Sequence, residues 1–599
     1  IVRLSMYNGD MKRLYRLTGM ILLFLLLANG LSASASRKTF RPWDPQTRAS
    51  GPHRSLRAAI RSSHPASRWS AGSNPQRPVQ GGGGSPLEPE LRRMLADAGE
   101  DEPVRVIVHL DQPPGAGASS LYGPGGVESA AELVSSLQAV AEQSQASLRA
   151  YLESERARGG VSSYRPLWIT NAIAVQANAS AVRSIAARPS VAAVVPDHWR
   201  RWIASPIAPE GLETKTVDAV EWNVERIRAD EVWSSLQISG TGAVVAGMDT
   251  GVDWLHPVLQ SSYRGYNPHG VSTHAYSWCD ATDGGAIYPV DGHGHGSHTL
   301  GTAVGQNGIG VAPGATWIGV RVLNSQGYGY DSWIHSGFQW LLAPGGDPSR
   351  APDVVNCSWG NSSGALTTFR SDLRALRAAG ILPVFSNGND GPGEGTVTSP
   401  ASLSEALAVG AVDQFDEIAT FSSRGPSPWG EIRPHVVAPG VDIRSSMPGG
   451  TYATMNGTSM AAPHVSGVAA LMRSVSPTLS ITRTTYVITS TARQLGGGVP
   501  NNDLGWGRVD ALAAVTTLAR PGFITGSVWD AEENSPIKGA RVVALPHGGQ
   551  ASGDTTTDAE GRFSLALSPG MYDVTISAFG YEPATVRGVC VLSGSVVSR

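Results

Sequence analysis

Three short segments, far apart in the sequence, contain the residue types that acyl transfer by a serine nucleophile requires. They hold Asp249 before Thr250-Gly251, His295 before Gly296-Ser297-His298, and Ser459 between Gly457-Thr458 and Met460-Ala461-Ala462-Pro463. Such chemistry needs a hydroxyl that attacks, a base that takes its proton and a carboxylate that orients the base. The order Asp, His, Ser is one of the known orders of this triad. We therefore predict that Ser459 is the nucleophile, His295 the base and Asp249 the orienting group.

The sequence around Asp249 and Ser459 predicts elements that suit these roles. The apolar run 243–248 predicts a buried strand of a parallel sheet, and Asp249 follows it. The carboxyl ends of parallel strands are where α/β sheets place their sites. Ser459 precedes a small-residue and apolar stretch, 460–472, that predicts a buried helix. A serine at a helix start is often only a cap, so its role depends on the other two segments.

His295 lies in a glycine-rich segment with two further histidines, His293 and His298. Because His295 and His298 are three residues apart and could share a helical face, a zinc site is an alternative. The sequence contains no His-Glu-x-x-His pattern, and no separated carboxylate stands out as a third ligand. The pattern therefore favours a single base over a metal.

A side-chain amide is expected beside the triad. The apolar run 381–385 predicts a strand that leads into the polar turn Ser386-Asn387-Gly388-Asn389. An amide in this turn could donate a hydrogen bond to the oxyanion that forms on the attacked carbonyl. The residues alone leave Asn387 and Asn389 as alternatives.

Residues from about 219 to 519 resemble the subtilase family of serine endopeptidases, and in detail its bacillopeptidase F-like branch. Beyond the three segments above, the resemblance rests on the stretches 223–227, 310–315 and 353–360. It implies an α/β fold with a doubly wound parallel sheet and hydrolysis of protein or peptide substrates through an acyl-enzyme. It further implies the residue roles catalytic Asp249, His295 and Ser459, oxyanion donor Asn389, and substrate strand Ser358, Trp359 and Gly360. No organic cofactor is implied; structural calcium is common in the family, but the sequence assigns no ligands to it.

Composition limits the classes of protein. At 599 residues the chain is too long for one ordinary domain. The net charge of −3 gives no support for a nucleic-acid partner. The three cysteines, Cys279, Cys357 and Cys590, cannot all pair within one chain, and a bridge between the first two stays open.

The first 86 residues predict export. Within 1–35, basic residues at 11–16, an apolar run at 20–27 and small residues at 33–35 follow the order of a secretory signal. The apolar run is shorter than the roughly 20 residues of a membrane span. We expect a secreted, extracellular protein without a stable membrane span. Residues 36–86, rich in Arg, Ser and Pro and ending in glycines, predict a disordered linker.

Residues 87–200 predict a separate α+β domain. The expected elements, in order, are a strand at 104–110, a helix at 128–158, a strand at 167–176, a helix at 179–188 and a strand at 191–195. The pattern resembles the ferredoxin-like, inhibitory propeptide of subtilisin-type enzymes. The resemblance implies self-cleavage between about 196 and 220, with the propeptide tail in the active cleft. A permanent ferredoxin-like domain is the alternative.

Residues 522–599 change to the alternating pattern of β-strands and predict a small all-β sandwich. They resemble a carboxypeptidase regulatory-like domain through 524–530, 536–540 and 578–581. We expect a spacer or a surface-binding module there. Just before it, residues 505–515 resemble the terminal helix of the family's catalytic domain.

The sequence thus predicts a secreted serine endopeptidase, made as a zymogen that its own propeptide inhibits. Two other classes remain open: a catalytically silent binding protein with the same fold, and a metal-dependent hydrolase centred on His293, His295 and His298. The sequence indicates neither the side chain preferred at the cleaved bond nor the physiological substrate.

Overall fold

The computed structural model describes residues 2–4, 86–111, 129–203, 210–213, 219–546, 553–567, 569–591 and 594–598. The predicted signal segment and linker lie almost wholly outside these ranges. Within the described residues, no helix has both the length and the apolar character needed to cross a membrane.

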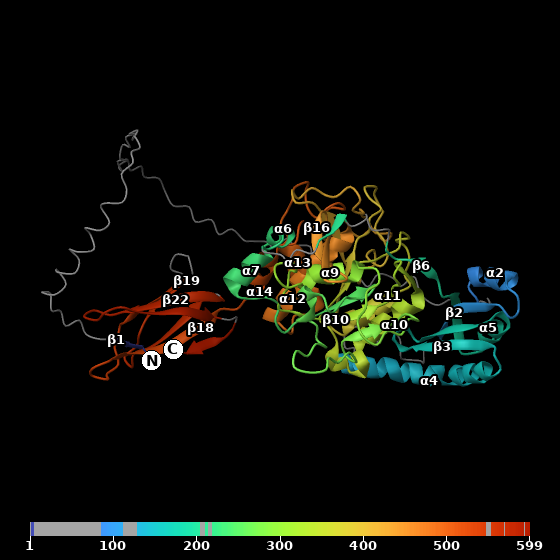
Figure 1. Cartoon of the computed structure of the whole chain (residues 1–599), viewed down its shortest axis with the longest axis horizontal. Helices are drawn as coiled ribbons and strands as arrows, with labels where there is room; N and C mark the ends of the chain where they lie inside the picture. Colours follow the sequence, from blue (N-terminus) through green and yellow to red (C-terminus); the bar gives the residue numbers. More distant parts are fainter. Residues whose placement is uncertain are drawn as a thin grey trace, which may run out of the picture. The chain divides into compact units, whose positions relative to one another are not determined.

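A seven-stranded, all-parallel sheet forms the centre of the region from residue 219 to residue 518 (Figure 1). In spatial order its strands are β15 (Val436–Pro439), β14 (Leu407–Val412), β13 (Leu382–Ser386), β12 (Val354–Cys357), β8 (Val244–Asp249), β10 (Thr316–Arg321) and β9 (Trp278–Asp280). The inner strands are short apolar runs because both faces of the sheet are covered. The predicted α/β fold of this region is confirmed.

Helices cover both faces of this sheet. Neighbouring residues of β8 belong to different buried clusters, Val245 to one and Ala246 to the other. The first cluster includes residues of α7 (Ala229–Leu236), α9 (His295–Val304), α12 (Thr458–Val475), α13 (Ile481–Ser490) and α14 (Ala511–Leu518). The second includes residues of α10 (Asp331–Leu342) and α11 (Arg370–Ala378). Because side chains alternate along a strand, five strands contribute side chains to both cores: β8, β10, β12, β13 and β14.

Smaller elements border the sheet. They are α6 (Trp222–Arg226), α8 (Pro257–Gln260), β11 (Tyr328–Tyr330), and the antiparallel strands β16 (Ile443–Met447), β17 (Thr451–Met455) and β7 (Glu210–Glu213). The last helix of this region, α14, does not cover the expected residues 505–515. Helix α14 begins at Ala511, because Asp510 Oδ1 accepts the Ala513 N–H at 2.8 Å and caps the helix there.

The N-terminal region (residues 86–203) contains a four-stranded antiparallel sheet of order β3-β4-β2-β5. Its elements are α2 (Pro89–Asp97), β2 (Pro103–Leu110), α4 (Ala130–Ala157), β3 (Val161–Leu167), η2 (Trp168–Thr170), β4 (Ala172–Asn178), α5 (Ala179–Ala186), β5 (Val191–Pro196) and β6 (Trp199–Arg201). The single strand expected at 167–176 is wrong. The chain reverses at Asn171, whose φ of 48° is left-handed, so two strands flank a short 3₁₀ turn.

Helix α4 contributes to two hydrophobic cores. Its second half supplies Leu148 and Leu152 to the core of the N-terminal region. Its first half supplies Leu133, Val134 and Leu137 to the buried cluster that contains the residues of α10 and α11. The N-terminal region therefore shares a buried apolar surface with the region of the seven-stranded sheet.

Residues 522–598, together with residues 2–4, form two four-stranded sheets. The first contains β1 (Val2–Leu4), β18 (Gly522–Asp530), β21 (Arg562–Leu567) and β24 (Val596–Ser598); the second contains β20 (Gly553–Thr556), β19 (Arg541–Pro546), β22 (Gly570–Ser577) and β23 (Ala584–Val591). Burial alternates along β21, where Phe563, Leu565 and Leu567 are buried between exposed residues. This pattern agrees with strands that have one covered face.

The bridge between Cys279 and Cys357 that the sequence left open is absent, and both thiols are free. Cys279 lies on β9 and Cys357 on β12, with β10 and β8 between them. Three strand spacings of about 4.8 Å place the two backbones roughly 14 Å apart. A disulfide requires Cα atoms within about 7 Å.

Candidate active site

The predicted site residues meet at one edge of the parallel sheet. Asp249 is the last residue of β8, Ser358 follows β12, and Asn389 lies in the turn after β13. These three strands are neighbours and parallel, so their carboxyl ends lie together. His295 begins α9, and Ser459 is the second residue of α12. Residues more than two hundred positions apart are thereby brought to one place.

Asp249 and His295 form a buried hydrogen-bonded pair. His295 Nδ1 lies 2.8 Å from Asp249 Oδ1, and the two side chains are only 3% and 2% exposed. The Thr250 N–H also donates to this carboxylate oxygen, at 2.8 Å. A carboxylate on Nδ1 selects the tautomer in which Nε2 carries the lone pair. The pair therefore presents an oriented proton acceptor.

Asp291, which the sequence reasoning did not single out, connects the segments of Asp249 and His295. Its Oδ1 accepts hydrogen bonds from Thr250 Oγ1 at 2.9 Å and from the amides of His293 and Gly294 at 3.0 and 2.8 Å. Its Oδ2 accepts from the Ser297 amide at 2.9 Å and from Ser297 Oγ at 2.8 Å. One carboxylate thus fixes the start of α9 against the end of β8. The position of an acid four residues before His295 was the available signal.

Ser459 lies in the same cleft as His295 but is not hydrogen-bonded to it. Its hydroxyl donates to the Ser358 carbonyl oxygen at 2.9 Å, and the Ser358 hydroxyl donates to the Ser459 carbonyl at 2.8 Å. His295, Ser459 and Asn389 line one pocket together with Ser358, Trp359 and Gly360. Asp249, which completes the predicted triad, lies behind His295.

The structure distinguishes the two asparagines. Asn387 is fully buried, and its Nδ2 donates to the Ser423 carbonyl at 2.6 Å, so it holds a loop together. Asn389 lines the cleft, and its Oδ1 accepts hydrogen bonds from the amide and hydroxyl of Thr458 at 3.0 and 2.8 Å. This anchoring of the oxygen leaves the Asn389 NH₂ group available as a donor.

The tail of the N-terminal region occupies part of this cleft. Trp202 and Ile203 are among the residues that line the pocket with Ser459. The Gly360 amide donates to the Trp202 carbonyl at 3.0 Å, and the Trp202 amide donates to the Gly327 carbonyl at 2.9 Å. The Trp202 ring lies edge-on to Trp359, with centroids 5.5 Å apart. The tail thus lies between two backbone edges, of which sequence reasoning predicted only the one at Ser358, Trp359 and Gly360.

His298 and Cys357, two buried residues near the site, lie in surroundings that fit a structural role. His298 Nε2 lies 3.0 Å from the Ile443 carbonyl and 3.1 Å from that of Ala453, and burial lowers the pKa of His298 to about 3. Among the described residues, no three His, Cys, Asp or Glu side chains are grouped to hold a metal ion. Burial raises the pKa of the Cys357 thiol well above its ordinary value, which opposes a role as nucleophile.

Comparison with known proteins agrees with this geometry. The model of the Subtilase family matches residues 240–507, and that of the Carboxypeptidase regulatory-like domain matches residues 524–598. Subtilisin amylosacchariticus of Bacillus subtilis subsp. amylosacchariticus is 35% identical over 332 residues, which cover 54% of this chain and 76% of that protein. The chain therefore belongs to the subtilase family of serine endopeptidases, and it carries a C-terminal regulatory-like domain.

Two further relatives show how far the similarity extends. Bacillopeptidase F of Bacillus subtilis (strain 168) is 41% identical over 411 residues, which cover 64% of this chain. The aligned part spans only 28% of that protein's length. Alkaline elastase YaB of Bacillus sp. (strain YaB) is 35% identical over 315 residues, covering 51% of this chain and 72% of that protein.

Proposed function

We propose that this chain is the zymogen of a secreted serine endopeptidase that hydrolyses protein or peptide substrates through an acyl-enzyme. The observation that carries the proposal is the Asp249–His295 hydrogen bond of 2.8 Å beside a cleft that also contains Ser459 and Asn389. In this proposal residues 86–203 are an inhibitory, ferredoxin-like propeptide, and residues 522–599 form a β-sandwich.

Each side chain has a defined task in the proposed reaction. The Ser459 hydroxyl turns about its Cα–Cβ bond from the Ser358 carbonyl toward His295 Nε2, transfers its proton there and attacks the peptide carbonyl. Asp249 holds the ring and stabilises the imidazolium that forms. The Asn389 NH₂ group and the Ser459 amide donate to the oxyanion. His295 then protonates the leaving amine, and water hydrolyses the acyl-enzyme.

The contacts of the tail support the zymogen part of the proposal. The hydrogen bonds of Trp202 with Gly327 and Gly360 are those by which an extended peptide joins a strand edge. Such main-chain bonds do not depend on side chains, so the tail competes with substrates for the same edges. We propose that Ser459 cleaves the chain after Ile203 and before Val220.

A serine-directed fluorophosphonate probe tests the nucleophile. We expect labelling of the matured wild-type protein and no labelling of Ser459→Ala. Ser362→Ala is the matched control, because Ser362 lines the same pocket and has no assigned role. Labelling that persists in Ser459→Ala, or is lost equally in both variants, contradicts the proposal.

Self-processing is tested on the full chain. Wild-type protein should separate into two fragments during expression, and amino-terminal sequencing of the larger one should give a start between residues 204 and 220. The Ser459→Ala chain should stay in one piece. Processing of that variant at the same bond in the absence of other proteases would overturn self-cleavage.

A further inference from the structure

The tail strand places an arginine against a buried acid of the cleft. Strand β6 pairs antiparallel with β11, with Arg201 opposite Tyr328, Arg200 opposite Gly329 and Trp199 opposite Tyr330. The chain then continues into the pocket that holds Ser459, through Trp202 and Ile203. A substrate bound along the same edge would follow the same path, because strand addition fixes the backbone register.

Arg200 lies beside Asp331, the first residue of α10. Arg200 Nε is 3.3 Å from Asp331 Oδ1 and 3.5 Å from Oδ2, and the Asp331 side chain is only 4% exposed. Burial raises the pKa of Asp331 to about 6, against the opposing effect of the Arg200 charge. A buried carboxylate is costly without a cation, so this position favours a basic partner.

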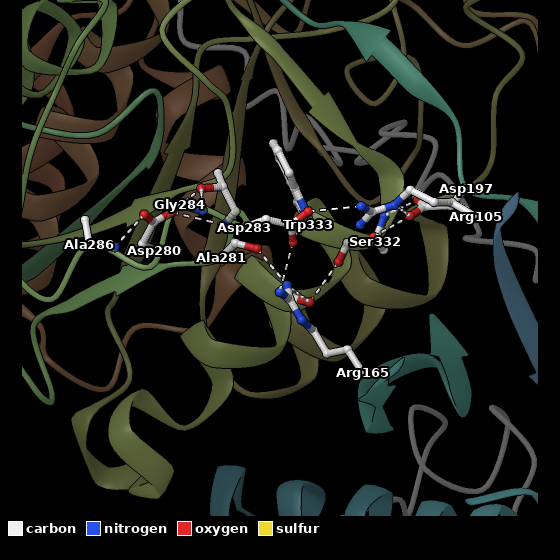
Figure 2. Close-up of polar contacts among 12 residues, drawn as sticks. Arg105, Arg165, Asp197, Asp280, Ala281, Asp283, Gly284, Ala286, Ser332 and Trp333 are labelled. Carbon is white, nitrogen blue, oxygen red and sulfur yellow. Dashed lines mark hydrogen bonds and ion pairs between the residues drawn. The ribbon is translucent and has the colours of Figure 1, made fainter. Parts of the chain in front are cut away.

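The ion pairs of the folded N-terminal sheet are of a different kind. Arg105 of β2 and Arg165 of β3 both lie near Asp283, at 3.0 and 3.5 Å (Figure 2). Asp283 is 52% exposed and also accepts a hydrogen bond from Trp333 Nε1 at 3.1 Å. These arginines project from strands of a folded sheet, which no extended substrate reproduces. Arg200 alone of the three lies on the segment that leads into the cleft.

Resting on the proposed function, we propose that Asp331 is a specificity-determining residue that selects polypeptides with a basic side chain, above all arginine, upstream of the cleaved bond. Because Ile203 still precedes the proposed cleavage, Arg200 lies at least four residues before that bond. The chain's own tail occupies the subsite in the zymogen. After maturation, Asp331 pairs with the arginine of a substrate at the same register.

An arginine scan of fluorogenic peptides tests the inference on the matured enzyme. The peptides share one cleavable core and carry arginine, glutamate or the neutral glutamine at each of the eight positions before the cleaved bond. We expect arginine to raise kcat/KM about tenfold at one position, four or more residues upstream, which corresponds to about 1.4 kcal/mol. In Asp331→Asn this advantage should fall to within about twofold of unity, and Asp331→Lys should favour glutamate there.

Asp283→Asn is the matched control. It removes an equal charge that contacts the N-terminal sheet and not the tail, so the arginine advantage should persist. A flat scan in wild-type enzyme that cleaves the neutral peptide overturns the inference, and so does an equal advantage in Asp331→Asn. If Asp331→Asn fails to mature, a flat wild-type scan still overturns the inference, and an undiminished arginine advantage in Asp331→Lys overturns the role of Asp331. Absence of any cleavage and of fluorophosphonate labelling would instead overturn the proposed function.

Discussion

Two buried histidine–aspartate pairs lie in the same domain, and only one of them borders the cleft. His295 Nδ1 is 2.8 Å from Asp249, and His335 Nδ1 is 2.9 Å from Asp372, with all four side chains at most 3% exposed. The second pair joins α10 to α11 and lies against the Phe369 ring, 5.0 Å between centroids. A histidine oriented by a carboxylate is therefore not by itself a site. The two pairs differ because His295 shares its cleft with the Ser459 hydroxyl and the Asn389 amide.

Replacing the histidine of each pair tests this difference most strongly. His295→Ala should lower kcat by about 10⁶-fold, since removing a triad base costs about as much as removing the whole triad. His335→Gln should leave kcat of the matured enzyme within about twofold, because its ring does not border the pocket. Active-site titration followed by turnover of a fluorogenic peptide measures both. A large loss of kcat in His335→Gln would contradict the claim that only the His295 pair takes part in the reaction.

Replacing the aspartate of each pair should affect different quantities: kcat for Asp249 and the free energy of unfolding for Asp372. Asp249→Asn should lower kcat by about 10⁴-fold, because the amide selects the wrong tautomer of His295. Asp372→Asn should instead lower the free energy of unfolding by about 3–5 kcal/mol, since it breaks a buried pair. Turnover and urea unfolding, measured on both variants, check the two directions. Equal losses of turnover would contradict the assignment.

Asn389→Ala should remove the amide donor that distinguishes the surroundings of His295 from those of His335. Loss of one oxyanion donor typically costs about 10² to 10³-fold in kcat. KM should change little, because the hydrogen bond strengthens only as negative charge develops. A rise in KM with unchanged kcat would assign Asn389 to substrate binding instead.

The pH dependence of stability should distinguish buried histidines with and without a carboxylate. His464 Nδ1 donates to the Met460 carbonyl at 2.9 Å and Nε2 faces the Asn223 amide nitrogen at 2.8 Å, and burial lowers the pKa of His464 to about 4. Between about pH 6.5 and pH 4 only the unfolded chain binds this proton, so acid destabilises the protein by about 1.4 kcal/mol per pH unit.

His335 should act with the opposite sign. Burial lowers its pKa, but the charge and hydrogen bond of Asp372, with Asp331 and Asp197, outweigh burial and hold the pKa above 6.5. Its stabilisation is complete below pH 6.5 and is lost as the pH rises through the folded-state pKa. Urea unfolding measures the free energy of unfolding against pH for His464→Gln and His335→Gln, in a Ser459→Ala background that prevents autolysis. His464→Gln should change the slope of this curve between about pH 4 and pH 6.5, and His335→Gln should change it above pH 6.5. Identical slopes would contradict both protonation states.

The sequence predicted which side chains meet at the cleft better than it predicted their surroundings. Asp249, His295 and Ser459 were found because each follows or begins an element whose hydrophobic pattern is local. The missed features depend on contacts distant in sequence. Asp291 matters because of its hydrogen bond with Thr250 on another segment, and Trp202 because two separate backbone segments enclose it.

The secondary-structure errors have a different, local origin. The run 167–176 is continuously apolar around Thr170 and Asn171, so nothing in its periodicity marks the reversal at Asn171. Helix α2 was not predicted, since only Leu91 and Leu95 of its nine residues are buried. The terminal helix was placed too early because the capping role of Asp510 is not visible in a hydrophobic pattern.

The shared burial of helix α4 determines how latency would end. The packing of Leu133, Val134 and Leu137 in the apolar cluster does not depend on the covalent link after Ile203. The ion pairs to Asp283 do not depend on that link either. In the zymogen that we propose, cutting that link would therefore leave a non-covalent complex in which residues 86–203 stay bound. In that proposal, dissociation would govern the onset of activity, and dilution or digestion of the released fragment, more than the cut itself, would switch the enzyme on.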